Sequence, residues 1–291
     1  MVLAGSKKVG PPPKKTILPE PELASLMYHD IFDYPMTKAE LKKWKFGPKT
    51  KRQITILARK IGQYYILNGR EKTITKRPFR NSASLRKIDL ARNAARVLGK
   101  LPSVIMVAVT GALAMMNADV DSDIDLLIIT SARTLWTTRL LVYASLDLMG
   151  IPRRRYGVKK QKDRLCLNMW LDESDLAWDN TDRNLYTAHE IAQIVPLVNK
   201  ERTYERFIYN NSWIKHYWPN AVKIPKSTRV PRTAASPLSL IEPFARNFQF
   251  WYMREKITRE VVSPTKAIFH PRDWGKIIQD KLAFMTGRVF D

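Results

Sequence analysis

The chain has 291 residues, 45% of them hydrophobic, which is enough for a buried core in one or two domains. Its 50 lysines and arginines outnumber 27 acidic residues, and the net charge of +23 favours a polyanionic partner such as nucleic acid. No apolar run approaches the ~18 residues of a membrane span, no secretory signal is recognisable, and the single Cys166 has no disulfide partner. These features predict a cytoplasmic protein that has no membrane partner.

The positive charge is concentrated in the flanks of the chain. Net charge is +12 over residues 1–80, +3 over 81–200 and +8 over 201–291. A nearly neutral central block between basic flanks is typical of a protein whose flanks hold a polyanion beside a separate active site.

The first 82 residues predict a basic tail followed by a small helical domain. Residues 1–16 form the tail, and 17–82 form a winged-helix-like domain. Helices are expected from Pro21 to Asp33 and after capping boxes at Thr37 and Thr50. A β-hairpin is expected from strands 64–67 and 72–76. The third helix carries a basic face that predicts nucleic-acid contacts through Lys51, Arg52 and Arg59.

The central block carries the residues with the clearest chemistry. After a linking helix over 83–100, an apolar strand ends at Thr110, Gly111 makes a sharp turn, and a second strand carries Asp123 and Asp125. Side chains alternate along a strand, so these carboxylates face the same way, with Cα atoms ~6–7 Å apart. They therefore suit hard divalent cations, while the backbone at Gly111 permits close approach of a phosphate.

This pattern resembles the nucleotidyltransferase superfamily with the DNA polymerase β-type palm. The matching residues are Thr110-Gly111-Ala112, followed about ten residues later by Asp123-Ile124-Asp125. The resemblance implies a mixed sheet with helices over residues 83–200, and NMP transfer with two Mg²⁺ ions held by Asp123 and Asp125. It also implies an NTP, ATP first among them, bound by a set of nucleotide-binding residues: Thr110, Gly111, Ala112, Ser122 and Asn168.

Two positions depart from the family pattern. Ala112 replaces the usual serine, and Asn168 lies in the later strand, 165–171, from which the family often contributes a third carboxylate. Asp163 and Asp172 flank that strand, and either is a candidate for the third acid. Arg153, Arg154 and Arg155 precede it and are predicted to contact triphosphate or nucleic acid.

The remaining elements complete an α+β fold. Helices are expected over 132–149 and 183–199, followed by a basic, proline-containing linker over 201–237 and a helical C-terminal region over 238–291, with helices near 239–261 and 271–286. Arg183, Asn184, Tyr186 and His189 are further candidates for nucleotide contact. The aromatic residues around Phe244 to Tyr252 have helical spacing that favours a core position over a base-stacking surface.

The predicted function is Mg²⁺-dependent transfer of NMP to a hydroxyl acceptor, with an RNA end as the leading acceptor. Adenylylation of a protein, as performed by nucleotidyltransferases of toxin–antitoxin type, is an alternative, as is modification of a small molecule. A third hypothesis is a DNA-binding regulator that senses NTP without turning it over, which Ala112 and Asn168 favour. The sequence leaves the oligomeric state open.

Overall fold

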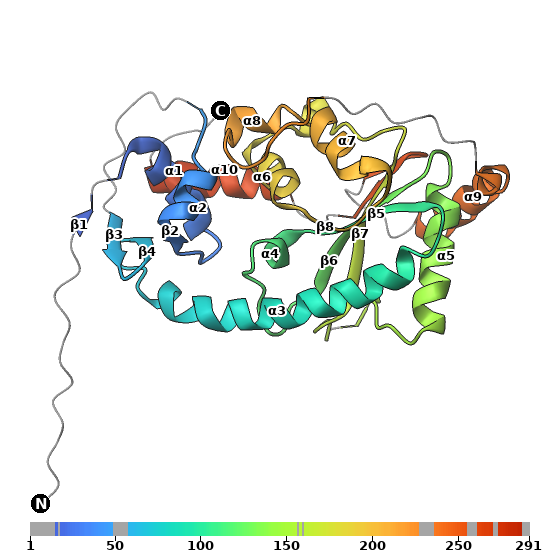
Figure 1. Cartoon of the computed structure of the whole chain (residues 1–291), viewed down its shortest axis with the longest axis horizontal. Helices are drawn as coiled ribbons and strands as arrows, with labels where there is room; N and C mark the ends of the chain where they lie inside the picture. Colours follow the sequence, from blue (N-terminus) through green and yellow to red (C-terminus); the bar gives the residue numbers. More distant parts are fainter. Residues whose placement is uncertain are drawn as a thin grey trace, which may run out of the picture.

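The structure is a computed structural model that describes residues 15–16, 18–48, 58–155, 157–158, 160–226, 236–254, 261–269 and 273–286. A small antiparallel sheet and a larger mixed sheet are joined by a long helix that runs past both (Figure 1). None of the described helices combines the length and apolar character needed to cross a membrane. The α+β class predicted from the sequence is confirmed.

The N-terminal unit consists of a four-stranded antiparallel sheet, in the order β1-β3-β4-β2, and two helices. The capping box predicted at Thr37 is present: Glu40 N–H donates to Thr37 Oγ1 at 3.3 Å, and Thr37 N–H donates to Glu40 Oε2 at 2.8 Å. The elements are β1 (Lys15–Thr16), α1 (Glu20–Asp30), β2 (Met36–Thr37), α2 (Lys38–Lys43), β3 (Ala58–Ile61) and β4 (Tyr64–Leu67).

The hairpin lies one strand earlier in the chain than predicted. It joins β3 to β4 through Gly62, whose φ of 57° suits a tight turn, and residues 72–76 are helical. Arg59, predicted on a third helix, lies in β3 and pairs with Glu71 at 3.2 Å. Strand β3 has four residues, and a segment this short fits the helical and the strand period equally well. The sequence pattern therefore predicted a helix where the structure has a strand. Lys51, Arg52 and the rest of that predicted helix up to residue 57 lie outside the described residues.

The 27-residue helix α3 (Lys72–Leu98) connects the two sheets (Figure 1). Only its second half matches the linking helix predicted over 83–100. The first half lacks an apolar stripe and is held to the N-terminal unit by ion pairs, such as Arg77 with Glu40 at 2.6 Å and Lys76 with Asp33 at 2.8 Å. Periodicity of apolar residues cannot detect a helix that is stabilised in this way.

The larger sheet has the order β8-β5-β6-β7-β10-β9, in which only β6 and β7 are parallel. Leu126 and Ile128 of β6 pack in the core formed with α3 and α5, whereas Leu127 and Ile129 pack in the core formed with α6, α7 and α8. The elements are β5 (Val104–Val109), α4 (Gly111–Ala114), β6 (Ile124–Thr130), α5 (Leu135–Leu148), β7 (Leu165–Asp172), α6 (Leu185–Gln193), β8 (Val195–Asn199), α7 (Thr203–Asn210), α8 (Ile214–Tyr217), β9 (Val261–Val262) and β10 (Lys266–Ile268).

The predicted helix over 183–199 is a helix followed by a strand. α6 ends at Gln193 because Pro196 disfavours helical backbone at Val195, and β8 is an edge strand, where proline is tolerated. The prediction of a linker over 201–237 is also wrong in part, because this region contains α7 and α8.

The C-terminal region is mixed and not purely helical. It contains the short 3₁₀ helix η3 (Pro237–Leu240), α9 (Glu242–Met253) and α10 (Trp274–Thr286), but β9 and β10 add two strands to the large sheet. The expected helix over 239–261 therefore ends before Val261. Helix α10 returns to contact α1 and α6, which ties this region to the N-terminal unit.

Candidate active site

A pocket of about 1520 Å³ brings together residues from β6, β7, α6, α9 and the N-terminal unit. Arg59 is not among its lining residues, and Lys51 and Arg52 lie outside the described part of the chain. Most of the residues predicted to form the site do line it, namely Thr110, Gly111, Ala112, Ser122, Asp123, Asp125, Arg153, Arg154, Arg155 and Asn168.

Asp123 directly precedes β6 and Asp125 is the second residue of that strand, so alternation along the extended chain puts both carboxylates on the same side. Their carboxylate oxygens and the Cys166 sulfur of the neighbouring strand lie within 4.8 Å of one another. Burial, with a smaller contribution from the adjacent Asp123 carboxylate, raises the pKa of Asp125 to about 6. Two clustered carboxylates, one of them poorly solvated, favour the binding of a cation.

Gly111 lies against Asp125, at the turn between β5 and α4. Its φ is 60°, and a Cβ atom at this position would lie 3.0 Å from Asp125 Oδ2. Thr110 N–H donates to the main-chain oxygen of Asp125 at 3.1 Å. The turn therefore fixes the position of the Asp125 carboxylate. Gly111 is also the first residue of the four-residue helix α4, to which Ala112 belongs.

Asn168 is directed at Asp125 from the parallel strand β7. Its Nδ2 donates to Asp125 Oδ1 at 3.0 Å, whereas its Oδ1 is buried without a hydrogen-bond partner among the described residues. A buried acceptor without a partner is costly. The free oxygen therefore fits a donor or a cation supplied by a bound ligand.

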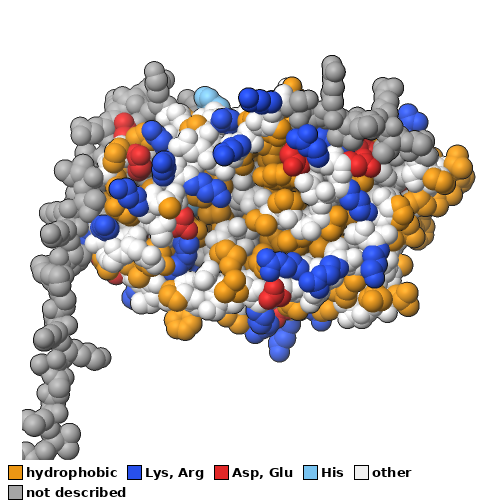
Figure 2. Space-filling model, viewed as in Figure 1, with side chains coloured by type: hydrophobic (Ala, Val, Ile, Leu, Met, Phe, Trp, Pro, Cys, Tyr) orange, Lys and Arg blue, Asp and Glu red, His pale blue; other side chains and the backbone are white. Residues whose placement is uncertain are grey.

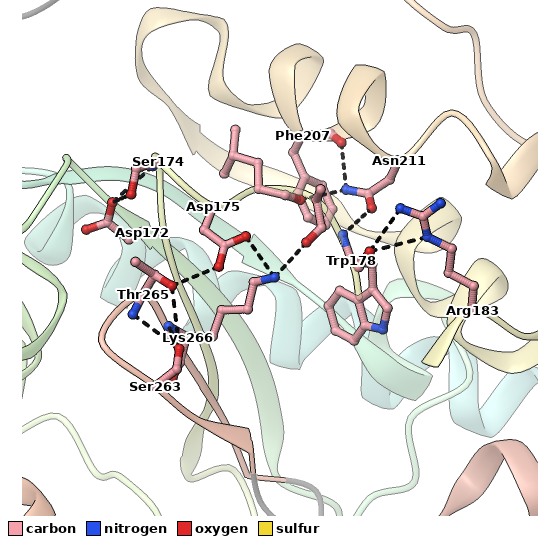
Figure 3. A network of polar contacts seen from close by, with 12 residues as sticks. Asp172, Ser174, Asp175, Trp178, Arg183, Phe207, Asn211, Ser263, Thr265 and Lys266 are labelled. Carbon is pink, nitrogen blue, oxygen red and sulfur yellow. Dashed lines mark hydrogen bonds and ion pairs between the residues drawn. The ribbon is translucent and has the colours of Figure 1, made fainter. Parts of the chain in front are cut away.

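Neither predicted source of a third carboxylate supplies one. Asp163 pairs with Lys87 at 2.6 Å and with Arg86 at 2.8 Å, and these cations hold the pKa of its carboxyl below the usual range. Asp172 lies at the opposite end of β7, paired in register with Thr130. There it accepts from Ser174 within the polar network of Figure 3, which also joins Asp175 to Lys266. Both acids are structural.

Glu190 of α6 is a further acid in the pocket, and the sequence did not reveal it. It accepts a 2.6 Å hydrogen bond from Gln193, and its pKa is raised to about 8 by burial, with a smaller contribution from the charge of Asp125. The available signal was weak: a single acidic residue between the buried His189 and Ile191. Tyr186 and His189 line the pocket too, whereas Arg183 and Asn184 are not among its lining residues.

Three consecutive arginines line the pocket beside the acids. Arg154 Nη1 lies 3.0 Å from Asp123 Oδ2, so it compensates the charge of that carboxylate. Arg153 and Arg155 pair with Asp147 at 2.8 Å and 3.8 Å. Their location at the pocket gives an anionic ligand access to guanidinium groups.

Lys87 anchors the loop that leads into β6. The side chain is fully buried, and its Nζ donates to Ser122 O at 2.6 Å, to Val120 O at 3.1 Å and to Asp163 at 2.6 Å. Ser122 Oγ donates to Asp119 O at 2.9 Å. The residue preceding Asp123 is therefore held from α3, well away in the sequence.

The donor set fits a hard divalent cation. Burial and the two carboxylates raise the pKa of the Cys166 thiol well above its usual range, so the sulfur stays protonated and is a poor ligand. The oxygens of Asp123, Asp125 and Asn168 remain, and such ligands suit Mg²⁺ or Mn²⁺ more than zinc.

No protein-family model matches this chain. Neither the curated proteins nor the solved structures compared with it give a significant match.

Proposed function

We propose that the chain is a Mg²⁺-dependent nucleotidyltransferase that transfers NMP from an NTP to a hydroxyl group, with an RNA end as the acceptor. The observation that carries this proposal is the pair Asp123 and Asp125, clustered at the start of β6 beside the Gly111 turn, in a pocket of about 1520 Å³. That volume exceeds the range of ~300–1,000 Å³ typical of ligand pockets. It therefore accommodates a nucleotide together with part of an acceptor.

We assign a separate role to each group of residues in the pocket. Asp123 and Asp125 would hold Mg²⁺, which supplies Lewis-acid activation of the hydroxyl and neutralises charge on the leaving pyrophosphate. Asn168 orients Asp125 through its 3.0 Å hydrogen bond. Arg154, now paired with Asp123, is free to turn to a phosphate oxygen once a cation binds both acids. Arg153 and Arg155 extend the cationic wall toward the acceptor.

The palm fold of the polymerase β type remains part of this proposal. Support comes from the mixed sheet, in which antiparallel β5 and β6 are joined through the glycine turn and β6 continues parallel to β7. The winged-helix-like character of residues 17–82 is also proposed, on the presence of α1, α2 and the β3–β4 hairpin. The basic flanks would bring the nucleic acid to the pocket.

A second candidate function, NTP sensing without turnover, is favoured by one observation. Asn168 occupies the pocket position on β7 beside Asp125, and a neutral amide adds no negative charge for a second cation. A site in which Asp123 and Asp125 are the clustered carboxylates among the described residues can bind Mg²⁺–NTP and still lack the charge needed for catalysis.

Pyrophosphate release distinguishes these functions. Each of the four NTPs is incubated with the protein and Mg²⁺, with and without cellular RNA. The variants are Asp123→Asn and, as a matched control, Asp121→Asn, which changes an exposed acid of the same loop that pairs with Lys162 at 3.4 Å. RNA-dependent release that is lost in Asp123→Asn and kept in Asp121→Asn supports the transferase. NTP binding without release supports the sensor, and release that is independent of Asp123 contradicts both.

A further inference from the structure

The α9 helix presents aromatic rings to solvent, in contrast to the core position expected from their spacing. Phe244 is 78% exposed, Phe248 57% and Trp251 64%. Figure 2 shows hydrophobic side chains gathered at the end of the molecule where α9 and α5 lie. We call this surface the α9 stripe, and it consists of Leu240, Ile241, Phe244, Phe248, Trp251 and Tyr252. Exposed apolar surface of this extent marks a binding site.

The stripe is exposed although the helix itself is firmly attached. Glu242 accepts hydrogen bonds from the main-chain N–H groups of Trp136 and Thr137 at 2.7 Å and 2.8 Å, so it caps the start of α5. Gln249 is buried, and it bonds to Trp136 O at 2.7 Å and to Arg139 at 2.6 Å. The opposite face of α9 is thus fixed by polar contacts, and the stripe is held outward.

The stripe leads into the candidate active site. Tyr252, at its C-terminal end, lines the same pocket as Asp123 and Asp125, together with Tyr143 and Arg153. The Arg153 guanidinium lies 4.6 Å from the centre of the Tyr143 ring. Rings and cations therefore follow one another from the outer surface to the carboxylates.

We propose that the α9 stripe binds single-stranded nucleic acid and directs its end into the pocket. This inference rests on the function proposed above, because it assigns the acceptor to that site. Four of the six stripe side chains are aromatic, and such rings stack on bases of any sequence. Phe248 and Trp251 are neighbours, with ring centroids 6.3 Å apart and planes inclined by 35°, so they present adjacent platforms.

Charge complements the rings. Glu242 is the only acidic residue in α9, and its carboxylate is turned away from the stripe into the contact with α5. Arg153 and Arg155 stand at the pocket, and the chain as a whole carries +23. Phosphates that follow the stripe would meet guanidinium groups before they reach the aspartates. A lipid surface or a second copy of the chain would explain the exposed rings, but neither explains why they lead to the pocket.

Fluorescence anisotropy of a labelled oligoadenylate of about 15 nucleotides, as RNA and as DNA, tests this assignment on the full chain. The double variant Phe248→Ala/Trp251→Ala removes two exposed rings. Phe248→Tyr/Trp251→Phe retains stacking, and Phe79→Ala removes a more exposed ring, 74% exposed, from α3. We expect binding to weaken at least about tenfold in the alanine double variant and to stay within about twofold in the other two.

Several outcomes would overturn the assignment. The unaltered chain could fail to bind the oligonucleotide, or the alanine double variant could bind it as tightly as the unaltered chain. The double variant could also keep oligonucleotide binding and lose self-association or binding to phosphatidylserine vesicles instead. Asp123→Asn keeps this test separate from the proposed activity, because it removes pyrophosphate release and leaves the stripe intact. If the alanine double variant loses oligonucleotide binding but the unaltered chain releases no pyrophosphate, the stripe is a nucleic-acid-binding surface and the proposed transferase activity is rejected. If the unaltered chain releases pyrophosphate and the alanine double variant binds the oligonucleotide as before, only the role of the stripe is rejected.

Discussion

Asn168 donates a 3.0 Å hydrogen bond from Nδ2 to Asp125 Oδ1, while its own Oδ1 is buried without a partner among the described residues. The amide is therefore oriented by the carboxylate, and its acceptor stays buried without a partner among the described residues. This arrangement links the neutral residue on β7 to the acid on β6, and it makes Asn168 the position at which the number of charged ligands can be tested.

Replacing Asn168 with aspartate should make the protein depend on a divalent cation. A third carboxylate beside Asp125 repels it, so the Asn168→Asp variant should melt about 2–4 °C lower in EDTA for each 1 kcal/mol of repulsion. Mg²⁺ should restore the loss, with binding roughly tenfold tighter than in the unaltered protein. Differential scanning fluorimetry across a Mg²⁺ series measures both effects. A variant whose melting temperature ignores Mg²⁺ would exclude a cation at this position.

Gly111 should tolerate alanine less well than another glycine with the same backbone. Gly111 and Gly150 have φ values of 60° and 65°, but a Cβ atom at Gly111 meets Asp125 Oδ2 at 3.0 Å, and one at Gly150 meets nothing within 4 Å. The left-handed backbone alone costs about 1–3 kcal/mol with alanine. Urea unfolding should show that cost in both variants and a larger one in Gly111→Ala. Only Gly111→Ala should lower pyrophosphate release, and equal behaviour of the two would disprove the contact.

Lys87 should matter for both stability and activity, because it is the fully buried anchor of the loop before Asp123. Its replacement by methionine leaves Asp163 and two main-chain oxygens without this donor, at a cost of about 3–5 kcal/mol. Arg86 contacts the same carboxylate from a half-exposed position, and Arg86→Ala should cost about 1 kcal/mol or less. Chemical unfolding measures both. A Lys87→Met variant as stable as Arg86→Ala would show that the anchor is dispensable.

The buried pair His29 and His189 should make stability depend on pH. Their Nε2 atoms lie 3.2 Å apart, and His29 Nδ1 donates to Ser25 O at 2.8 Å, so His29 Nε2 must accept from His189. Burial lowers the pKa of His29 to about 4, and burial also lowers the pKa of His189 well below its usual value. Both rings are therefore neutral in the folded protein near neutral pH.

The direction of the pH effect follows from those shifts. Below about pH 6.5 the two histidines are protonated in the unfolded chain but stay neutral in the folded protein. The free energy of unfolding therefore falls as pH decreases toward 4, by up to about 1.4 kcal/mol per pH unit for each ring. Above pH 6.5 both rings are neutral in both states, so the free energy of unfolding no longer changes with pH because of these histidines. Urea unfolding from pH 7.5 to 4.5 should show a weaker slope in His189→Gln than in His216→Gln, a change at an exposed histidine. Identical slopes would contradict the assignment of neutral rings.

The sequence was most informative where backbone and chemistry are local. The strand over 104–109, the turn at Gly111 and the strand with Asp123 and Asp125 follow from apolar runs, a glycine and adjacent acids, and the structure places them as expected. Arg154 and Asn168 were found because they flank or interrupt a neighbouring apolar strand. These signals all lie within a few residues of the group that they position.

Features that depend on distant contacts could not be predicted. Glu190 reaches the pocket because α6 packs across the face of β6, and nothing in its neighbours reports that contact. The first half of α3 is helical because its basic residues pair with Asp33 and Glu40 of the N-terminal unit. The stripe on α9 has the spacing of a core helix, and only the docking of its opposite face by Glu242 and Gln249 exposes the rings.

Transfer of label from the α-phosphate to RNA is the direct test of nucleotidyl transfer at Asp123 and Asp125. RNA is incubated with the protein, Mg²⁺ and an NTP labelled at the α- or the γ-phosphorus, beside Asp125→Asn and Asp121→Asn. In-line attack at the α-phosphorus predicts that RNA gains the α-label only, that the γ-label leaves as pyrophosphate, and that Asp125→Asn alone abolishes transfer. Appearance of the γ-label in RNA, or equal transfer by Asp125→Asn, would contradict nucleotidyl transfer at this site.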